Sequence, residues 1–376
     1  MNKKDFNDEL NEKWNPKKRY SYKLSSVYSR IGYHEKAKRV SECGNILNIG
    51  CYSDGKHYLQ SANFCKDPLC PMCAWRKEIK MFNQTVKCVD VLKSDYDFIF
   101  MTLTVKNIPA DSNLLKDTVK SMNKAFNKFK RLQAIKNIMC GCLKSLEVSY
   151  DGNEFITKDM YNGNKKRHIK SKKRYYDKHG LKIGDKNPNY NMLHPHFHLL
   201  VAVPKGYCKS DAYIKQSDLC NMWKNSLGVD YVPMCDIRKV TNKKQKIKGK
   251  YITHDFSSAV AEVCKYSVKS SDYLNFSDKE NEKIVKVLVD GLLGIRMFNF
   301  MGVLREMRKR LKLGEIDSDL IHVDDDEKSH GDLLYTMVFL WSPKKKEYIQ
   351  HDVIMSERIL DISTDSPGSD PPLITG

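Results

Sequence analysis

The sequence predicts an α+β fold with a central antiparallel or mixed sheet flanked by helices. Three strand-like apolar runs, YDFIFMTLTVKN, GCLKSLEVSY and HPHFHLLVAV, follow one another along the chain, and segments with helical spacing lie between and after them. A third observation adds a cysteine-rich module upstream of the sheet, because Cys65, Cys70 and Cys73 crowd into the stretch FCKDPLCPMC.

The predicted elements alternate along the chain. A strand at 96–107 leads into an amphipathic helix at 111–132, whose start is marked by an Asp111-Ser112 cap. After it we expect a strand at 141–150, a basic insertion at 151–190, a strand at 194–203, a helix at 213–227, a strand at 232–240, a helix at 256–272, and a largely helical region at 281–312 with a short strand at 295–300. The insertion is rich in Lys, Tyr, Asn and Gly, which predicts a loop or hairpin.

The charge balance of the 376 residues points to a polyanionic partner. Lys and Arg number 65 against 46 Asp and Glu, a net charge of +19, and DNA or RNA is the first expectation. An anionic membrane is the competing partner, but no basic helix has an opposed apolar face, and no apolar run spans a bilayer. The N-terminus is polar where a signal peptide would be apolar, so we expect a cytoplasmic protein with no membrane partner.

Three histidines recur at every second position of HPHFHLLVAV. Side chains alternate along a strand, so His194, His196 and His198 share one face of the sheet, while Phe197 and Leu199 face the other way. Two imidazoles at this spacing can hold one divalent ion, although histidines on a solvated sheet face are the simpler interpretation.

A second polar group falls in AEVCKYSVKSSDY. In a continuous helix, Glu262, Tyr266 and Lys269 follow at i, i+4 and i+7 and share one stripe. A phenol becomes a useful nucleophile when a cation favours its ionised form and a metal polarises the target, for which a phosphodiester is the natural substrate. The alternative is an ordinary amphipathic helix with a core tyrosine.

The order of these motifs resembles a known family. FCKDPLCPMCAWRK, FMTLTVKN, HPHFHLLV and EVCKYSVK, between about residues 43 and 311, are similar to segments of the replication initiators of rolling-circle plasmids, in the HUH endonuclease superfamily. GLLGIRMFNFMGVLREMRKRL also resembles the family's C-terminal element, to which we assign no catalytic role. The basic insertion is longer than is typical of the family.

The resemblance implies a metal-dependent DNA endonuclease and strand transferase. His196 and His198 would hold Mg²⁺ or Mn²⁺ with Glu147, and His194 would be a further ligand or would orient one. Glu147 could instead be an idle surface residue. Tyr266 would nick origin DNA and leave a 5′-phosphotyrosine and a free 3′-hydroxyl primer, and Lys269 would assist it.

Glu262 has two open roles. It would activate water so that replication stops after one round, or it would only pair with Lys265 or Lys269 on the helix surface.

The cysteines predict a structural zinc site, with unmetallated buried thiols as the alternative. The resemblance favours Cys43 as the fourth ligand beside Cys65, Cys70 and Cys73, and Cys51 and His57 remain alternatives.

Basic residues in two segments are predicted to contact DNA. Arg76 follows the cysteine cluster, although a basic turn would explain it equally. In the insertion, solvated charge is the alternative to DNA contact for a group of five residues: Lys165, Lys166, Arg167, Lys172 and Lys173.

The expected organisation has four parts: a basic N-terminal arm (1–42), a cysteine-rich zinc module (43–85), an HUH domain (90–312) with the insertion at 151–190, and a C-terminal extension (313–376) ending in a disordered tail. Expected partners are double- and single-stranded origin DNA, a host helicase and a polymerase. Alternative functions are an HUH transposase, a mobilisation relaxase, or a non-enzymatic zinc-dependent DNA-binding regulator.

Overall fold

The larger of two main sheets carries the predicted motifs. The structure, a computed structural model, describes residues 6–166, 169–240, 243–247, 250–254, 257–265, 268–323 and 331–356. The order of this sheet is β10-β5-β6-β3-β7, with β4 paired to β6, and each of these pairings is antiparallel. Its strands are β3 (Tyr96–Thr104), β4 (Ile108–Pro109), β5 (Gly141–Asp151), β6 (Met192–Pro204), β7 (Cys235–Lys239) and β10 (Phe298–Gly302). The predicted α+β class with an antiparallel sheet flanked by helices is confirmed.

One face of this sheet packs against α4 (Ser112–Phe129) and α8 (Gln216–Leu227), and α11 (Asp278–Gly291) packs on α4. The side chain of Asp111 caps α4 by accepting a hydrogen bond from the Leu114 N–H at 2.8 Å. Apolar residues at helical spacing on α4 then meet every second residue of β6. Phe197 of β6 contacts Phe126 at 6.0 Å and Trp223 at 6.5 Å between ring centroids.

The opposite face packs against α3 (Pro71–Leu92), α9 (Ser257–Cys264) and α12 (Val303–Arg310). Its core contains Phe100 and Leu200 from the sheet and Val260 and Leu304 from two of the helices. Because neighbouring residues on a strand point to opposite faces, His196 and Leu200 both face α3 and α9. The histidines therefore lie on a covered face, bordered by helices.

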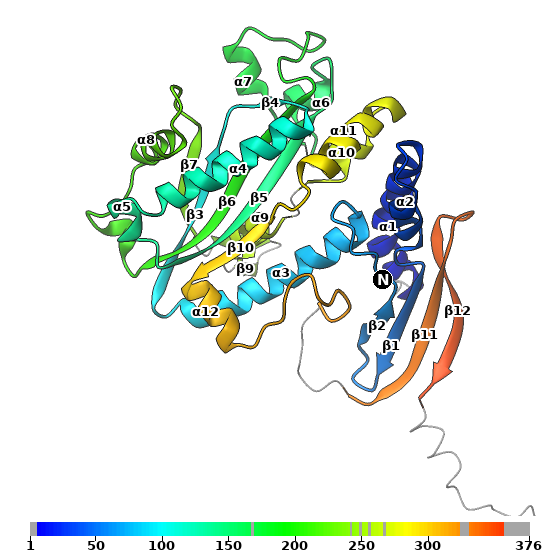
Figure 1. Ribbon diagram of the computed structural model, residues 1–376. Coiled ribbons are helices and arrows are strands. Elements are labelled where there is room, and N and C mark those ends of the chain that lie inside the picture. Colours follow the sequence, from blue (N-terminus) through cyan, green and yellow to red (C-terminus); the bar gives the residue numbers. More distant parts are fainter. Residues whose placement is uncertain are drawn as a thin grey trace, which may run out of the picture.

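A second sheet joins the two ends of the described chain. Its order is β12-β11-β1-β2, and Figure 1 shows it set apart from the larger sheet, with α1 and α2 beside it. Its strands are β1 (Ile46–Tyr52), β2 (His57–Ala62), β11 (Leu333–Ser342) and β12 (Glu347–Met355), and its helices are α1 (Phe6–Arg30) and α2 (His34–Glu42).

The first forty residues were expected to form a mobile arm or a helical lead-in, and the structure contains the helices α1 and α2 there. The packing of α1 against the strand β12 from the expected extension at 313–376 was not predicted. Trp14 of α1 is 4 % exposed and lies 6.5 Å from Tyr348 of β12, between ring centroids. The partners are more than 300 residues apart in sequence, so local periodicity gave no indication of the sheet. The tail expected to be disordered, 357–376, lies outside the described residues.

The basic insertion at 151–190 is folded around its own small core. Ile156, Met160 and Tyr176 are buried against one another. The remaining short elements of the chain are α5 (Gln133–Lys136), α6 (Lys158–Asn162), α7 (Lys173–Lys178), a 3₁₀ turn (Tyr207–Lys209), α10 (Ser271–Leu274), and a hairpin of β8 (Lys243–Ile247) and β9 (Lys250–His254). Among the described helices, none is long and apolar enough to cross a membrane.

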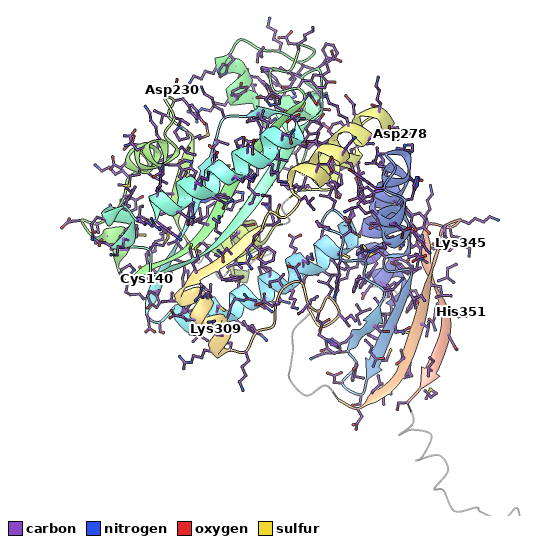
Figure 2. All side chains as sticks on the ribbon, viewed as in Figure 1. Cys140, Asp230, Asp278, Lys309, Lys345 and His351 are labelled. Carbon is purple, nitrogen blue, oxygen red and sulfur yellow. The ribbon has the colours of Figure 1, made fainter. Side chains whose placement is uncertain are left out.

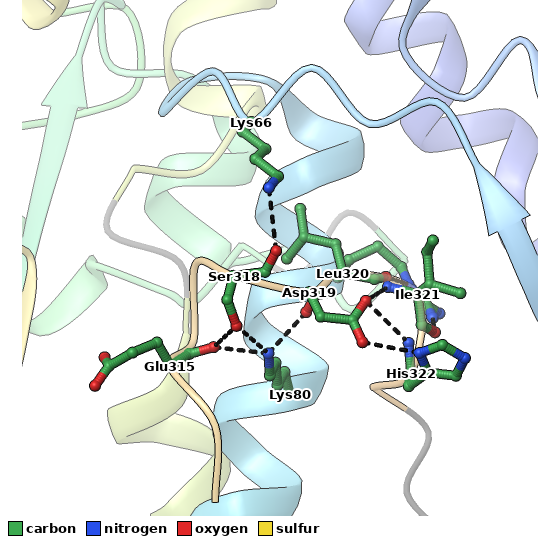
Figure 3. Close-up of polar contacts among 9 residues, drawn as sticks. Lys66, Lys80, Glu315, Ser318, Asp319, Leu320, Ile321 and His322 are labelled. Atoms are coloured by element: carbon green, nitrogen blue, oxygen red, sulfur yellow. Dashed lines mark hydrogen bonds and ion pairs between the residues drawn. The ribbon is translucent and has the colours of Figure 1, made fainter.

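Helix α3 anchors the segment that leaves the larger sheet. Lys80 donates to the backbone carbonyls of Glu315 at 2.7 Å and Asp319 at 2.8 Å, as Figure 3 shows. Arg76 is 0 % exposed and donates to the carbonyls of Leu320 at 2.9 Å and Ile321 at 2.6 Å. The prediction that Arg76 contacts DNA is therefore wrong in this structure, because its guanidinium is buried and donates to two backbone carbonyls of the chain.

Replacing Arg76 should destabilise the fold. We expect Arg76→Met to lower the free energy of unfolding by about 2 to 4 kcal/mol, because two buried carbonyls lose a charged donor. Lys77→Met is the matched control: Lys77 pairs at 2.6 Å with Asp317, whose side chain is 66 % exposed, so its loss should cost less than about 1 kcal/mol. Urea unfolding measures both, and equal stabilities would contradict the anchoring role.

Candidate active site and metal centres

A carboxylate and two imidazoles converge on the α9 face of the sheet. The register of β5 and β6 places Glu147 directly opposite His196. The Oε2 atom of Glu147 lies 3.0 Å from His198 Nε2 and 3.6 Å from His196 Nε2, and the two Nε2 atoms are 3.1 Å apart. All three side chains are buried. The group forms because residues with the same strand parity point to one face.

Hydrogen bonds behind the imidazoles fix their orientation. His196 Nδ1 lies 3.0 Å from the carbonyl oxygen of His194, and because a carbonyl only accepts, Nδ1 carries a proton. Nε2 faces Glu147, donates to it when the ring is an imidazolium, and presents a lone pair when the ring is neutral. His198 Nδ1 lies 3.3 Å from Thr102 Oγ1 on β3. Such contacts are typical of metal-binding histidines. The three facing atoms are all acceptors when Glu147 is ionised and both Nε2 atoms are unprotonated, so the group fits a divalent cation.

His194 itself lies beside this group. Its Nδ1 is 2.7 Å from Asn107 Oδ1, and its ring stacks on His196 with centroids 4.9 Å apart. Burial, with a contribution from the charge of His196, lowers the pKa of His194 to about 4. The His194 backbone carbonyl is thus the acceptor for His196 Nδ1, and its ring stacks on His196 but adds no atom to the converging ligand atoms.

Glu147 remains ionised although it is buried. Burial alone would raise the pKa of this carboxyl, but hydrogen bonds from His196 and His198 and the charge of Lys269 outweigh it and lower the pKa. Lys269 Nζ lies 3.3 Å from Glu147 Oε1. The predicted Glu147, His196, His198 and Lys269 are thereby brought together.

The helix expected at 256–272 is interrupted. Helix α9 ends at Cys264, Val268 to Ser270 are not helical, and α10 begins at Ser271. The single helical stripe of Glu262, Tyr266 and Lys269 is therefore wrong. Serines compete for backbone hydrogen bonds, and three of them follow Tyr266 within this segment, at 267, 270 and 271.

Of the two other site residues predicted in this segment, Tyr266 and Glu262, the structure describes only Glu262. Tyr266 lies outside the described residues. Glu262 is hydrogen-bonded to Lys265, and although burial alone would raise its pKa, this hydrogen bond and the charge of Lys265 lower it. The structure thus contains the surface pair that was one of the two expectations for Glu262.

Four cysteines form a second candidate metal centre. The sulfur atoms of Cys43, Cys65, Cys70 and Cys73 all lie within 4.8 Å of one another. Cys73 Sγ is 3.5 Å from Cys43 Sγ and 3.7 Å from Cys65 Sγ. Tetrahedral zinc with Zn–S bonds of roughly 2.3 Å gives S···S distances of roughly 3.8 Å, so the spacing fits.

The surroundings of these thiols suit thiolates. The N–H of Lys66 donates to Cys73 Sγ at 3.2 Å, and the N–H of Cys65 donates to Cys43 Sγ at 3.4 Å. Lys18 is fully buried beside the cluster, with Nζ 2.6 Å from the Cys43 carbonyl oxygen. Burial lowers the pKa of Lys18 to about 8, while the nearby thiols act in the opposite direction.

Comparisons with known proteins show the family of the chain. A family model described as Replication protein matches residues 56–349. The chain belongs to the replication protein family. A protein rep of Streptococcus pneumoniae serotype 2 is 32 % identical over 89 % of this chain and 91 % of its own length. A protein rep of Lentilactobacillus hilgardii is 30 % identical over 85 % and 90 %.

A protein rep of Bacillus amyloliquefaciens is 29 % identical over 89 % of this chain and 93 % of its own length. No solved structure matches. The family match confirms the resemblance to plasmid replication initiators that the motifs indicated.

The basic residues predicted to contact DNA differ in accessibility in this replication protein. Lys165, Lys166 and Lys173 are exposed on the insertion. Lys172 pairs with Asp151 at 3.1 Å, so its charge is partly neutralised within the chain. Arg167 lies outside the described residues.

Sequence reasoning missed several residues that support the two centres. Thr102 and Asn107 both lie in FMTLTVKN, a segment that carried the family resemblance, but neither residue was given a role in the site. Both are polar residues near the end of a predicted strand, a signal that could have been used. Lys18 gave no signal, since the sequence does not show that it is buried against Cys43, 25 residues away.

The cysteine cluster predicts one tightly held metal ion per chain. Cys43→Ser should lose that ion, because three thiolates and a hydroxyl bind far more weakly than four thiolates. Cys51→Ser is the matched control, since Cys51 is also buried but lies outside the cluster, opposite His57 in the second sheet. Elemental analysis of the purified proteins measures the metal. A full equivalent retained by Cys43→Ser would exclude Cys43 as a ligand.

Proposed function

We propose that this replication protein initiates rolling-circle replication of a plasmid by nicking one strand of its origin DNA, with Tyr266 as the nucleophile. The convergence of Glu147, His196 and His198 on one covered face, with Lys269 beside them, carries the proposal. The family match supports a role in replication.

The converging group would hold Mg²⁺ or Mn²⁺. An ion with two imidazole ligands and one carboxylate ligand keeps open positions, and it would polarise the oxygens of a scissile phosphate. The chain supplies the orientation: Thr102 and the His194 carbonyl hold the rings, and Lys269 neutralises the outer oxygen of Glu147.

In the proposed reaction the Tyr266 phenolate attacks the scissile phosphorus. A bond forms from the tyrosine oxygen to phosphorus, and the bond from phosphorus to the 3′-oxygen breaks. The phenol gives up its proton and the departing oxygen gains one, so the products are a 5′-phosphotyrosine and a free 3′-hydroxyl. Lys269 would favour the ionised phenol. Attack by a 3′-hydroxyl on the phosphotyrosine reverses the step and rejoins the strand.

Glu262 would act at termination in the proposed cycle. Hydrolysis of the phosphodiester at the second cut needs a base to activate water. The lowered pKa keeps Glu262 ionised but makes it a weak base while it is paired with Lys265. Glu262 is paired with Lys265 in this structure. To act as the base, its carboxylate would have to leave Lys265, or contact water while still paired, when DNA is bound.

The cysteine cluster would bind structural Zn²⁺. Cys70 precedes α3 and Cys73 lies in its first turn, so the ion would tie α3 to the end of α2 through Cys43. No ligand position remains open for chemistry once four thiolates are bound, which supports a structural role.

The free 3′-hydroxyl suits extension by a host polymerase, and displacement of the nicked strand calls for a host helicase. An HUH transposase or mobilisation relaxase would use the same chemistry, and the replication family match makes them second choices. A non-enzymatic DNA-binding regulator would leave the buried Glu147 group without a use. A complementation experiment separates these functions. Only a replication initiator should sustain a plasmid that carries its origin but lacks its own initiator gene.

Nicking tests the metal centre directly. His196→Ala and His198→Ala should each lower nicking of supercoiled origin plasmid in Mn²⁺ by at least about 100-fold, because a ligand is removed. Binding to the duplex origin should persist, since in this proposal the exposed basic residues supply most of the phosphate contacts. His194→Ala is the matched control and should retain more activity, because its ring lies outside the converging group. Nicking by both variants at the wild-type rate would remove the metal assignment.

Covalent adducts separate the roles of Tyr266 and Glu262. Tyr266→Phe should form no 5′-linked protein–DNA adduct, whereas Glu262→Ala should form the first adduct but fail at termination, so that single strands longer than unit length accumulate. Adducts are mapped by mass spectrometry. Tyr273 is an unsuitable substitute nucleophile, being fully buried with its hydroxyl donating to the Leu69 carbonyl at 2.6 Å. Adducts that persist in Tyr266→Phe, or unit-length products from Glu262→Ala, would refute the respective role.

The exposed lysines of the insertion would supply salt-sensitive affinity for DNA. Replacing Lys165, Lys166 and Lys173 with Ala should reduce the slope of log affinity against log salt by roughly 0.9 for each DNA phosphate that the protein no longer neutralises. The matched control replaces Lys120, Lys124 and Lys128, which are exposed on α4, with the same change of charge. Equal slopes for the two triple variants would show that the insertion has no special role.

A further inference from the structure

A cavity of about 820 Å³ lies on the same face of the larger sheet as the Glu147 group. Its walls come from α3, from β10 and the loop before it, and from α12, and they include Ser145 of β5 and Lys265 beside α9. The volume is within the range of roughly 300 to 1,000 Å³ typical of small-ligand sites. The loop and β10 belong to the segment GLLGIRMFNF, for which the sequence indicated no function.

The strand register connects the cavity with the converging group. Phe298 of β10 pairs with Ser145 of β5, and Ser145 pairs with His198 of β6. These residues form one row across the sheet and share a face. With neighbouring strands about 4.8 Å apart, the backbone of Phe298 is roughly 10 Å from that of His198. The cavity is therefore within reach of the nucleotides next to a phosphate held at the converging group.

The walls of the cavity combine apolar and cationic side chains. Leu293 is 69 % exposed at the cavity, an unusual exposure for a leucine, and Ile295 and Phe298 are partly buried there. Gly294 between them has a φ of +74°, a conformation that turns the chain out of α11 towards β10. Apolar and aromatic surface of this kind suits the face of a nucleobase.

The acids at the cavity pair with some of its cations but not with all of them. Lys36 pairs with Asp67, and Lys77 pairs with Asp317. In contrast, three further lining cations have no hydrogen-bond or ion-pair partner within the described part of the chain: Arg296, Arg305 and Lys309. Figure 2 shows the position of Lys309 on α12. Exposed cations beside an apolar hollow match the charge and the bases of a single DNA strand.

We propose that this cavity binds an unstacked base of single-stranded DNA next to the scissile phosphate, with Leu293 against the base and Arg296 and Arg305 on the backbone phosphates. The inference deepens the proposed function and rests on it for the position of the scissile phosphate. Within a duplex the base faces are covered by their neighbours, so the apolar wall would favour a single strand.

Binding of two fluorescent probes tests the proposal without cleavage. One is a short oligothymidylate, and the other is an abasic oligonucleotide with the same number of phosphates. Anisotropy is measured with no added divalent metal. The wild-type protein should bind the oligothymidylate roughly tenfold more tightly, since only this probe has bases that can stack in the cavity.

Leu293→Ser should bring that ratio towards one, and Leu293→Phe should keep it. The matched control is Val232→Ser, because Val232 is 62 % exposed and lies outside the cavity. Arg296→Gln with Arg305→Gln should weaken binding of both probes and reduce the salt slope by roughly 0.7 for each phosphate that is no longer neutralised. Arg131→Gln with Arg310→Gln, exposed residues outside the cavity, is the control for this change of charge.

An unchanged ratio in Leu293→Ser, or an equal decrease in Val232→Ser, would overturn the proposal. The nicking assay keeps this result separate from the proposed function. If the wild-type protein nicks origin DNA while the cavity variants bind both probes as it does, only the cavity assignment fails. If nicking is absent but Leu293→Ser still removes the preference for bases, the cavity assignment stands and the nicking proposal fails.

Discussion

The register of β5 against β6, which sets Glu147 opposite His196, is the constraint on which the rest of the site depends. A slip of one residue would turn every side chain to the other face, so it would place Glu147 in the apolar core beneath α4. The apolar residues of the two strands that pack against α4 exclude that slip. Packing on one face thus determines the chemistry available on the other.

The buried charge of Glu147 adds a second requirement. A carboxylate away from water is costly unless cations or donors compensate it, and here two imidazoles and Lys269 do so. These partners come from β6 and from the segment after α9, so the group links the sheet to the region that contains Tyr266. A divalent ion would take over part of this compensation, which couples metal binding to the position of that segment.

The sequence predicted well those features that depend on local spacing. The strand at 194–203, the α4 helix and its Asp111 cap, and the choice of Glu147 by strand parity all rest on residues near one another in the chain.

Features set by residues far apart in the sequence were missed. The burial of Arg76 depends on carbonyls more than 240 residues away. The second sheet was missed for the same reason, since β1 pairs with β11 across nearly the whole chain. The helix expected at 256–272 is present as α9 but does not continue to its expected end. Its apolar spacing continues, but its serines favour other backbone hydrogen bonds.

The pairing of β1 with β11 has a consequence for biosynthesis. While the ribosome extends the chain, β1 and β2 emerge early, but the strand that covers the open side of β1 is made only after about residue 333. Until then β1 is an unpaired edge, a form of strand prone to join other chains. The larger sheet, whose strands all lie between residues 96 and 302, can be completed first. The sheet that contains β1 and β2 should therefore be the last part of the protein to form. A ribosome that stops before β11 would release a protein with the Glu147 group assembled but with one side of β1 unpaired.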